Sequence, residues 1–301
     1  MTQNWELGTL NWELRKGGSA MGNALSGKVA FVTGAAAKRG MGRAVAVRMA
    51  MEGADVMVTD KFAAPKSAWA GDENWKGLDD VVKEIKALGR NAISAVAGVE
   101  NSKEVDAAVK ATIDRFGKID ILIHCGGTRG PVGVNIVDGD EKDWRLLFEV
   151  NTIGTMIVSK AVAKEMIRRN EGGKIVHIAS AAGKLPCPGS AAYAASKWAV
   201  IGITQALAME LAPYKINVNA INPGFFPTNL RDDDATMHSR EKGITVEQFR
   251  EEEYKMLSNM VPLKRMGTVE DIADLIYFLV SDQSKYLTGV NINITGGTLM
   301  H

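Results

Sequence analysis

Short apolar segments alternate with helical ones from residue 28 onward, and this alternation limits the possible folds more than any other feature. Seven segments suit buried strands: residues 29–32, 56–59, 92–96, 119–123, 175–178, 216–221 and 290–294. Helical stretches lie between them, near 42–52, 78–89, 101–116, 140–170, 190–212 and 269–281. The pattern predicts an α/β fold, a Rossmann-type, doubly wound, seven-stranded, mostly parallel sheet with helices on both faces.

No break in composition divides the 301 residues, so residues 27–301 are expected to form a single domain. Residues 1–26 stand apart as an N-terminal extension, in which Asn-Trp-Glu-Leu occurs twice. The stretch 225–266 is expected to be a long loop that covers a site near the end of the sheet.

Composition excludes several partners. The formal net charge is only +1, and no basic excess suggests nucleic acid. Uncharged runs are short, and no secretory signal is evident, so no membrane association is expected. Cys125 and Cys187 could pair, but a reduced cytoplasmic protein is the simpler interpretation. No metal site is expected, because Asp232-Asp233-Asp234 has no second ligand cluster nearby and is better interpreted as a solvated turn.

A glycine-rich turn follows the first predicted strand and precedes a helix. It reads Thr33-Gly34-Ala-Ala-Ala-Lys-Arg-Gly40-Met41-Gly42. Glycines in this place let backbone N–H groups approach a pyrophosphate, which the helix N-terminus also attracts. The spacing differs from G-x-G-x-x-G, so the motif alone is moderately specific, and a turn without ligand is the alternative. The sequence predicts a dinucleotide site.

Asp60 ends the second predicted strand. A carboxylate there can accept hydrogen bonds from the adenosine ribose and repel a 2′-phosphate, which favours NAD. Arg39 lies just before Gly40, and Lys61 lies just after Asp60. Either could hold the 2′-phosphate of NADP, so NADP stays possible. A turn residue that caps the next segment is the other interpretation of Asp60.

Ser180, Tyr193 and Lys197 form the predicted catalytic group. Tyr193 and Lys197 lie four apart, so they share one face of a helix, and Ser180 ends the strand before it. A nearby ammonium should lower the pKa of the phenol, and the serine hydroxyl can bond a substrate oxygen. The trio suits proton exchange with an alcohol or carbonyl, whereas a tyrosine and lysine alone could be an ordinary surface pair.

With these motifs the chain resembles the short-chain dehydrogenase/reductase family, in its shorter, single-domain form. The resemblance covers residues 25–297 and rests on the glycine turn, Asn151, the Ser180–Tyr193–Lys197 set, and Pro223-Gly224-x-x-x-Thr228. It implies that Tyr193 is the general acid/base and that Lys197 also holds the nicotinamide ribose. It further implies a locally opened helix at Asn151, which would hold a water connected to Lys197.

The resemblance also implies a cofactor-binding set. Its members are Gly34, Arg39, Gly40, Met41, Gly42, Asp60, Val99, Gly126, Tyr193, Lys197, Pro223, Gly224, Phe226 and Thr228. The backbone near Phe226 and the Thr228 hydroxyl would hold the carboxamide of the nicotinamide.

The chain departs from the family pattern at three places. The glycine turn is two residues longer than in most ketoreductases and resembles that of the family's enoyl reductases. Those enzymes place their lysine seven residues after the tyrosine, where this chain has Val200, so ketone/alcohol chemistry is favoured. His124 stands in a normally Asn-Asn-Ala-Gly segment, where a structural or cofactor-flanking role is expected. Gly98 replaces an aspartate that usually lies near adenine.

The predicted function is NAD(P)-dependent hydride transfer to or from a bulky, mostly apolar secondary alcohol or ketone. Leu185, Phe225, Met256 and Met260 are expected to line the substrate pocket. The alternatives are 3-oxoacyl reduction in fatty-acid synthesis with NADPH, and a non-catalytic dinucleotide sensor. Apolar sides of the helices that carry Asn151 and Tyr193 predict a homotetramer, with a dimer as second choice. Those sides contain Ile157, Val158, Val162, Met166, Trp198, Ile201, Gln205 and Met209.

Overall fold

A seven-stranded parallel sheet forms the centre of the molecule. The computed structural model describes residues 22–65 and 71–301. The strand order is β3-β2-β1-β4-β5-β6-β7, and each neighbouring pair is parallel. The strands are β1 (Val29–Thr33), β2 (Asp55–Asp60), β3 (Ala92–Val96), β4 (Ile121–His124), β5 (Gly173–Ile178), β6 (Ile216–Pro223) and β7 (Asn291–Ile294). The predicted doubly wound fold is confirmed, and the sheet is wholly parallel.

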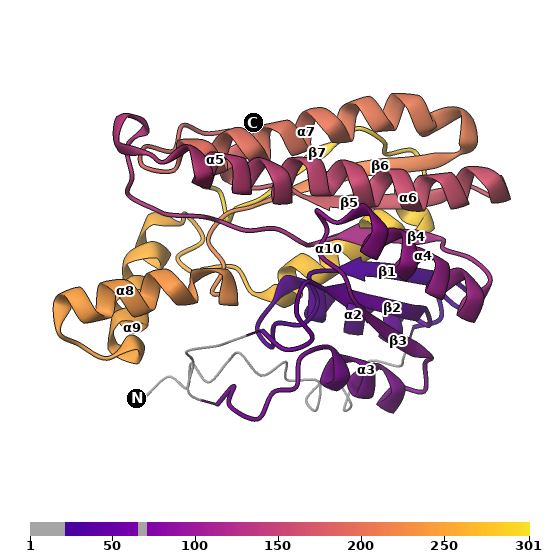
Figure 1. Cartoon of the computed structure of the whole chain (residues 1–301), viewed down its shortest axis with the longest axis horizontal. Coiled ribbons are helices and arrows are strands. Elements are labelled where there is room, and N and C mark those ends of the chain that lie inside the picture. The colour runs from indigo at the N-terminus through magenta and orange to yellow at the C-terminus, as the bar shows by residue number, and fades with distance from the viewer. Residues whose placement is uncertain (1–21, 66–70) are drawn as a thin grey trace.

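Helices cover both faces of this sheet (Figure 1). One layer contains α2 (Met41–Met51), α3 (Leu78–Ala87) and α10 (Val269–Val280). The other contains α4 (Ser102–Phe116), α5 (Glu141–Leu147), α6 (Gly154–Arg169) and α7 (Ala191–Leu211). Because all seven strands are parallel, their carboxyl ends meet at one edge of the sheet, where ligands bind in such folds.

The two layers bury separate apolar cores. Val32, Val45 and Ile276 belong to the core beneath α2, α3 and α10. Phe31 and Val158 belong to the core beneath α4, α6 and α7. Alternate residues of one strand thus serve opposite faces, as for Phe31 and Val32, which explains why these strands are apolar throughout.

Two helices occupy the stretch 225–266 that was expected to be a loop. They are α8 (Asp232–Lys242) and α9 (Val246–Met260). Thr245 caps α9, and its side chain and that of Gln248 bond each other's backbone N–H, a capping box that the sequence analysis overlooked. The two helices pack on each other and protrude from one end of the sheet (Figure 1). We call them the cover.

The N-terminal extension lies mostly outside the described residues, which begin at residue 22. Leu25, assigned to that extension, is buried in the core, and its N–H donates to the Glu52 carbonyl at 2.8 Å. The packed domain therefore already includes Leu25. Cys125 and Cys187 are both free thiols.

Part of the predicted subunit contact is internal. One side of α6 faces the sheet and is buried within the single chain. This side contains Ile157, Val158, Val162 and Met166. On α7, Trp198 and Met209 remain exposed, at 54% and 80%. The continuous helical stretch Glu141–Arg169 is long and apolar enough to cross a membrane, but it is mostly buried, and the core helix of a globular domain passes the same test.

Candidate active site

Ser180, Tyr193 and Lys197 meet where β5 ends and α7 begins. The Lys197 ammonium is buried and donates to the carbonyl of Ile178, the last residue of β5, at 2.9 Å. It lies 5.9 Å from the centroid of the Tyr193 ring. Ser180 has an extended backbone directly after β5, and its hydroxyl interacts with the Tyr193 phenol. The predicted trio is thus brought together, although its role in chemistry stays a prediction.

The electrostatics of this group correct one expectation. Lys197 was expected to lower the pKa of Tyr193, but burial raises the pKa of the phenol, opposed by the Ser180 hydrogen bond and the Arg129 charge. Burial also lowers the pKa of Lys197 to about 8. The ammonium points to a backbone carbonyl and is itself desolvated, so the phenol is neutral at neutral pH.

Asn151 holds the catalytic elements together. It lies in a π-helical segment, Phe148–Ile153, which is the kind of local opening that the family resemblance implied. Its amide accepts from the Thr128 N–H and donates to the Thr128 carbonyl, both at 2.8 Å. It also donates to the Ser196 hydroxyl at 3.0 Å, which in turn donates to the Tyr193 carbonyl at 2.7 Å. We call Thr128, Asn151, Ser196 and Tyr193 the catalytic frame.

The glycine turn between β1 and α2 is packed too closely for larger side chains. Gly34 has a φ of 66°, and a Cβ there would meet the Cys125 carbonyl carbon at 2.8 Å. A Cβ on Gly42 would lie 2.2 Å from the Gly34 carbonyl oxygen. Gly40, the N-cap of α2, has no side chain that could occupy the first amides of the helix, which fits an anion such as a pyrophosphate.

Asp60 braces this turn from the tip of β2. One carboxylate oxygen accepts from the Ala36 N–H at 3.0 Å, and burial raises the pKa of the carboxyl group. Lys61, which was weighed against it, is paired with Glu100 at 2.5 Å. Glu100 therefore compensates the charge of Lys61, whereas Asp60 bonds the glycine turn.

Arg39 was predicted to contact the cofactor, and its guanidinium is directed elsewhere. It is buried and pairs with Asp232 at 2.8 Å and with Asp72 at 3.4 Å. Its backbone N–H donates to the Asn229 side chain at 2.9 Å. The guanidinium that was expected to bind a phosphate thus pairs with two carboxylates. Through Asp232 it joins the glycine turn to the cover.

The acidic triplet was wrongly interpreted as a solvated turn. Asp232 begins α8 and is buried between Arg39 and Arg250, with both of which it forms ion pairs. Asp234 pairs with Arg129, which follows β4. The pairs with Arg39 and Arg129 attach the cover to the glycine turn and to the segment after β4, whereas the pair with Arg250 joins α8 to α9. Within residues 22–65 and 71–301, no group of three His, Cys, Asp or Glu side chains could hold a metal ion.

The remaining predicted cofactor residues lie along the same edge of the sheet. Met41 begins α2, Pro223 ends β6, and the others flank the strand ends: Val99, Gly126, Gly224, Phe226 and Thr228. The Gly126 N–H donates to the Thr33 hydroxyl at 3.0 Å, and the Gly224 N–H donates to the Ile294 carbonyl at 3.0 Å. The strand ends therefore hold these backbone segments in place.

His124 is a buried residue of the sheet. Its Nδ1 lies 3.0 Å from the Thr33 hydroxyl, and burial holds its pKa well below the usual range. It pairs in register with His177, whose two ring nitrogens bond Ser159 at 2.8 Å and Thr204 at 2.9 Å. The environment therefore supports a structural role and opposes that of a catalytic base.

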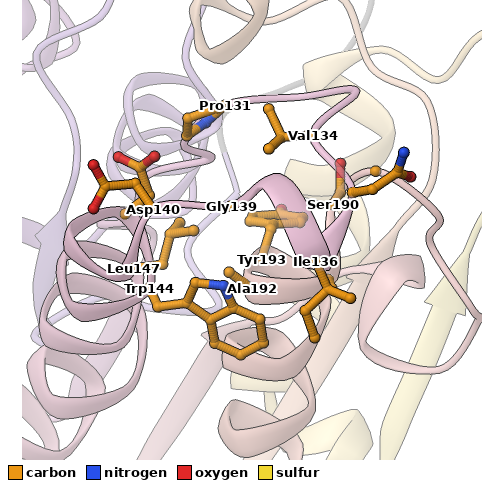
Figure 2. Close-up of a pocket in the computed structure, with 14 residues that line it drawn as sticks. Pro131, Val134, Ile136, Gly139, Asp140, Trp144, Leu147, Ser190, Ala192 and Tyr193 are labelled. Atoms are coloured by element: carbon orange, nitrogen blue, oxygen red, sulfur yellow. The ribbon is translucent and has the colours of Figure 1, made fainter.

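A small, open recess lies against Tyr193 (Figure 2). Its walls are Val134, Ile136, Trp144 and Leu147, with Asp140 and Asp143 at one side. All four residues predicted for the substrate pocket are described, and none lines this recess. Phe225 lines a second recess beside Arg265, Met256 and Met260 are exposed on α9, and Leu185 is partly buried.

Three contacts had little signal in the sequence. A Cβ on Gly127 would lie 3.1 Å from the Asn151 amide oxygen and 3.3 Å from the Lys197 ammonium, so this glycine admits both side chains. Gly127 is the second of two consecutive glycines after β4, and this pair could have indicated a close approach of side chains in the sequence. The Trp75 indole donates to the Ala36 carbonyl at 2.7 Å and closes the glycine turn from a distant segment.

The fold and these residues define a dinucleotide-dependent oxidoreductase of the Rossmann type. The family model described as "Enoyl-(Acyl carrier protein) reductase" matches residues 34–298. A 3-oxoacyl-[acyl-carrier-protein] reductase of Synechocystis is 35% identical over 279 residues, covering 92% of this chain and 99% of the relative. The chain belongs to the short-chain dehydrogenase/reductase family.

Solved structures agree with this assignment. A carveol dehydrogenase of Mycobacterium avium in complex with NAD matches with a TM-score of 0.82 and 29% identity, covering 93% of this chain and all of the other. An NAD⁺-bound xylitol dehydrogenase matches with a TM-score of 0.76 and 32% identity, covering 91% of this chain and 99% of the other. The protein is therefore an NAD(P)-dependent dehydrogenase/reductase.

Proposed function

We propose that this enzyme transfers a hydride between NAD and a secondary alcohol or ketone with a bulky, mostly apolar body. The observation that carries the proposal is the convergence of Ser180, Tyr193 and Lys197 at the carboxyl end of β5, beside an apolar recess. Tyrosine and lysine at this spacing favour ketone/alcohol chemistry, since enoyl reductases of the family need a lysine where this chain has Val200.

Each residue has a distinct role in the proposed mechanism. The Ser180 hydroxyl bonds the substrate oxygen, and the Tyr193 phenol exchanges the hydroxyl proton. Lys197 holds the cofactor ribose. Bound NAD supplies the hydride acceptor and a positive ring, which opposes the effect of burial on the phenol pKa. Asn151 keeps Tyr193 in place through Ser196.

The proposed cofactor is NAD rather than NADP. Asp60 lies at the tip of β2, while Lys61 and Arg39 are both paired with carboxylates. Wild-type enzyme should use NAD far better than NADP, and Asp60→Ala should narrow the difference. Asp79→Ala on α3, which removes an exposed carboxylate, is the control. Equal efficiency with both cofactors in the wild type would contradict this preference.

Two alternatives remain for comparison. The relatives at about a third identity include a 3-oxoacyl reductase, so reduction of a 3-oxoacyl thioester with NADPH is the second candidate. The third is a dinucleotide sensor, which has no need for the complete catalytic trio. Purified protein with NAD and a panel of secondary alcohols, followed by NADH absorbance, separates the three. NADPH-dependent reduction of a 3-oxoacyl thioester alone would favour the second.

We also propose a homotetramer, or failing that a dimer, in the cytoplasm. The exposed Trp198 and Met209 on α7 support a subunit contact, as do Ile153 and Met156 at the start of α6, each 39% exposed. Free cysteines suit a reducing compartment. Light scattering coupled to size exclusion tests the assembly, and a mass near 32.4 kDa would contradict it.

A further inference from the structure

An arginine directly after the catalytic frame has no role in the mechanism above. Arg129 follows β4, and its side chain is only 20% exposed. Its charge acts on the phenol of Tyr193 and on the thiol of Cys187, lowering the pKa of each against the effect of burial. In the chain, Arg129 directly follows Thr128, a member of the catalytic frame.

The catalytic frame fixes this cation relative to Tyr193. The residue before Arg129 is Thr128, whose N–H and carbonyl both bond the Asn151 amide. Ser196 connects that amide to the backbone of Tyr193. Two residues further on, Pro131 already lines the recess at Tyr193. A group held by Arg129 would thus have a defined position with respect to the phenol.

The present partner of Arg129 comes from the cover. Asp234 on α8 forms an ion pair with it and is 18% exposed. The cover packs mainly on itself and protrudes from the sheet, so Asp234 lies on an element with few contacts to the rest of the domain. A carboxylate at this place shows what the Arg129 guanidinium binds well, since planar carboxylates match its fork of donors.

We propose that Arg129 is a specificity-determining residue that holds an anionic group of the substrate, a carboxylate by preference, in exchange for Asp234. The inference rests on the proposed function and narrows its substrate class to hydroxy or keto acids with an apolar body. Figure 2 shows Val134, Ile136 and Trp144 around the recess, with Asp140 on one side. Asp140 and Asp143 repel an anion there, so the apolar body fits the recess and the anion faces Arg129.

Matched substrates test the proposal. A series of 3-hydroxy acids and their methyl esters is offered to the enzyme with NAD. The acid should be preferred in kcat/KM by about 10- to 100-fold, the range for a hydrogen-bonded charge. Arg129→Gln should abolish this preference, mainly through a higher KM for the acid. Arg231→Gln is the control, because Arg231, directly before α8, pairs with Glu253 on α9, and its loss should leave the preference unchanged.

Two further variants separate binding from folding. Asp234→Asn removes the competing carboxylate and should increase the acid-to-ester ratio. The double variant Arg129→Gln/Asp234→Asn removes both charges, so no unpaired carboxylate remains, and it should still lack the preference. Equal use of acid and ester by the wild type would overturn the inference alone. No turnover of either, by an enzyme that binds NAD, would overturn the proposed function and the inference with it.

Discussion

The catalytic frame and the cover differ in what holds them. The frame uses neutral hydrogen bonds between buried groups, such as those of Asn151 with Thr128 and Ser196. The cover is attached by charges, with Asp232 on Arg39 and Asp234 on Arg129. The frame belongs to the sheet and its packed helices, whereas α8 and α9 protrude from them (Figure 1).

This difference separates chemistry from specificity. A hydrogen-bonded frame in a packed core has one geometry, which proton transfer between fixed atoms requires. The buried pairs of Asp232 hold α8 firmly, whereas the partly exposed Arg129–Asp234 pair contributes less and can exchange partners, which a segment over an entry path requires. Variants in the frame should therefore affect turnover and global stability, and variants in the cover should affect local opening and substrate choice.

The largest expected effect is that of Tyr193→Phe in the frame. It removes the proton carrier and keeps the ring, so turnover should fall by about 10²–10⁴-fold or more. NAD affinity, measured by fluorescence titration, should change little. Near-wild-type turnover would remove Tyr193 from the mechanism and leave the frame without its proposed purpose.

Asn151→Ala should weaken the frame as a structure. It leaves the Thr128 N–H and the Ser196 hydroxyl without their buried partner, so the free energy of unfolding should fall by about 1–3 kcal/mol. Denaturant unfolding measures the loss. The exposed Asn259→Ala is the control. If the denaturant concentration at the midpoint of unfolding were unchanged, the hydrogen bonds of Asn151 would not stabilise the fold.

Asp232→Asn should loosen the cover and spare the sheet. The change removes the charge shared by Arg39 and Arg250, and the cover can open without exposing either core. Hydrogen exchange should increase several-fold in α8 and α9 and stay unchanged in β4 and β5. Asp114→Asn, in an exposed pair with Lys110, serves as control. Equal acceleration in the sheet would mean that cover and core form one cooperative unit.

The smallest expected effect concerns pH and Lys197. Its pKa is about 8 in the folded protein, against 10.5 for the ordinary side chain. Between these values the unfolded chain binds more protons, so the contribution of Lys197 to stability increases with pH. Urea unfolding from pH 7 to 10 should show this rise in wild type and a smaller one in Lys197→Met. If the stability of wild type and variant changed with pH in the same way, burial would not be lowering the pKa of Lys197.

The sequence allowed prediction of the fold and of Tyr193 and Lys197 from local patterns, and of Asn151 from the family resemblance, whereas Thr128 and Ser196 of the frame were not predicted. Buried parallel strands require continuous apolar runs, and each of the seven was found close to its observed bounds. Tyr193 and Lys197 share a face through helical spacing alone. The π-helical segment at Asn151 was anticipated because the family resemblance implied an opened helix there.

The cover was missed because its contacts join residues far apart in the chain. Arg39 and Asp232 are 193 residues apart, and Arg129 and Asp234 are 105 apart, so neither pair has a local signal. A run of three aspartates is usually solvated. Here Asp232 can be buried because arginines from distant parts of the chain pair with it. Met256 and Met260 resembled pocket residues by composition, whereas Leu257 is the buried residue on that turn of α9.

Isotope transfer tests the central claim most directly. The enzyme is incubated with NAD and a secondary alcohol that carries deuterium on its carbinol carbon, and the cofactor is analysed by mass spectrometry. Hydride transfer from that carbon predicts one deuterium in the reduced cofactor of the wild type and a strongly reduced amount with Tyr193→Phe. Reduced cofactor without deuterium, or none with any alcohol or acid of the panel, would contradict the proposed reaction.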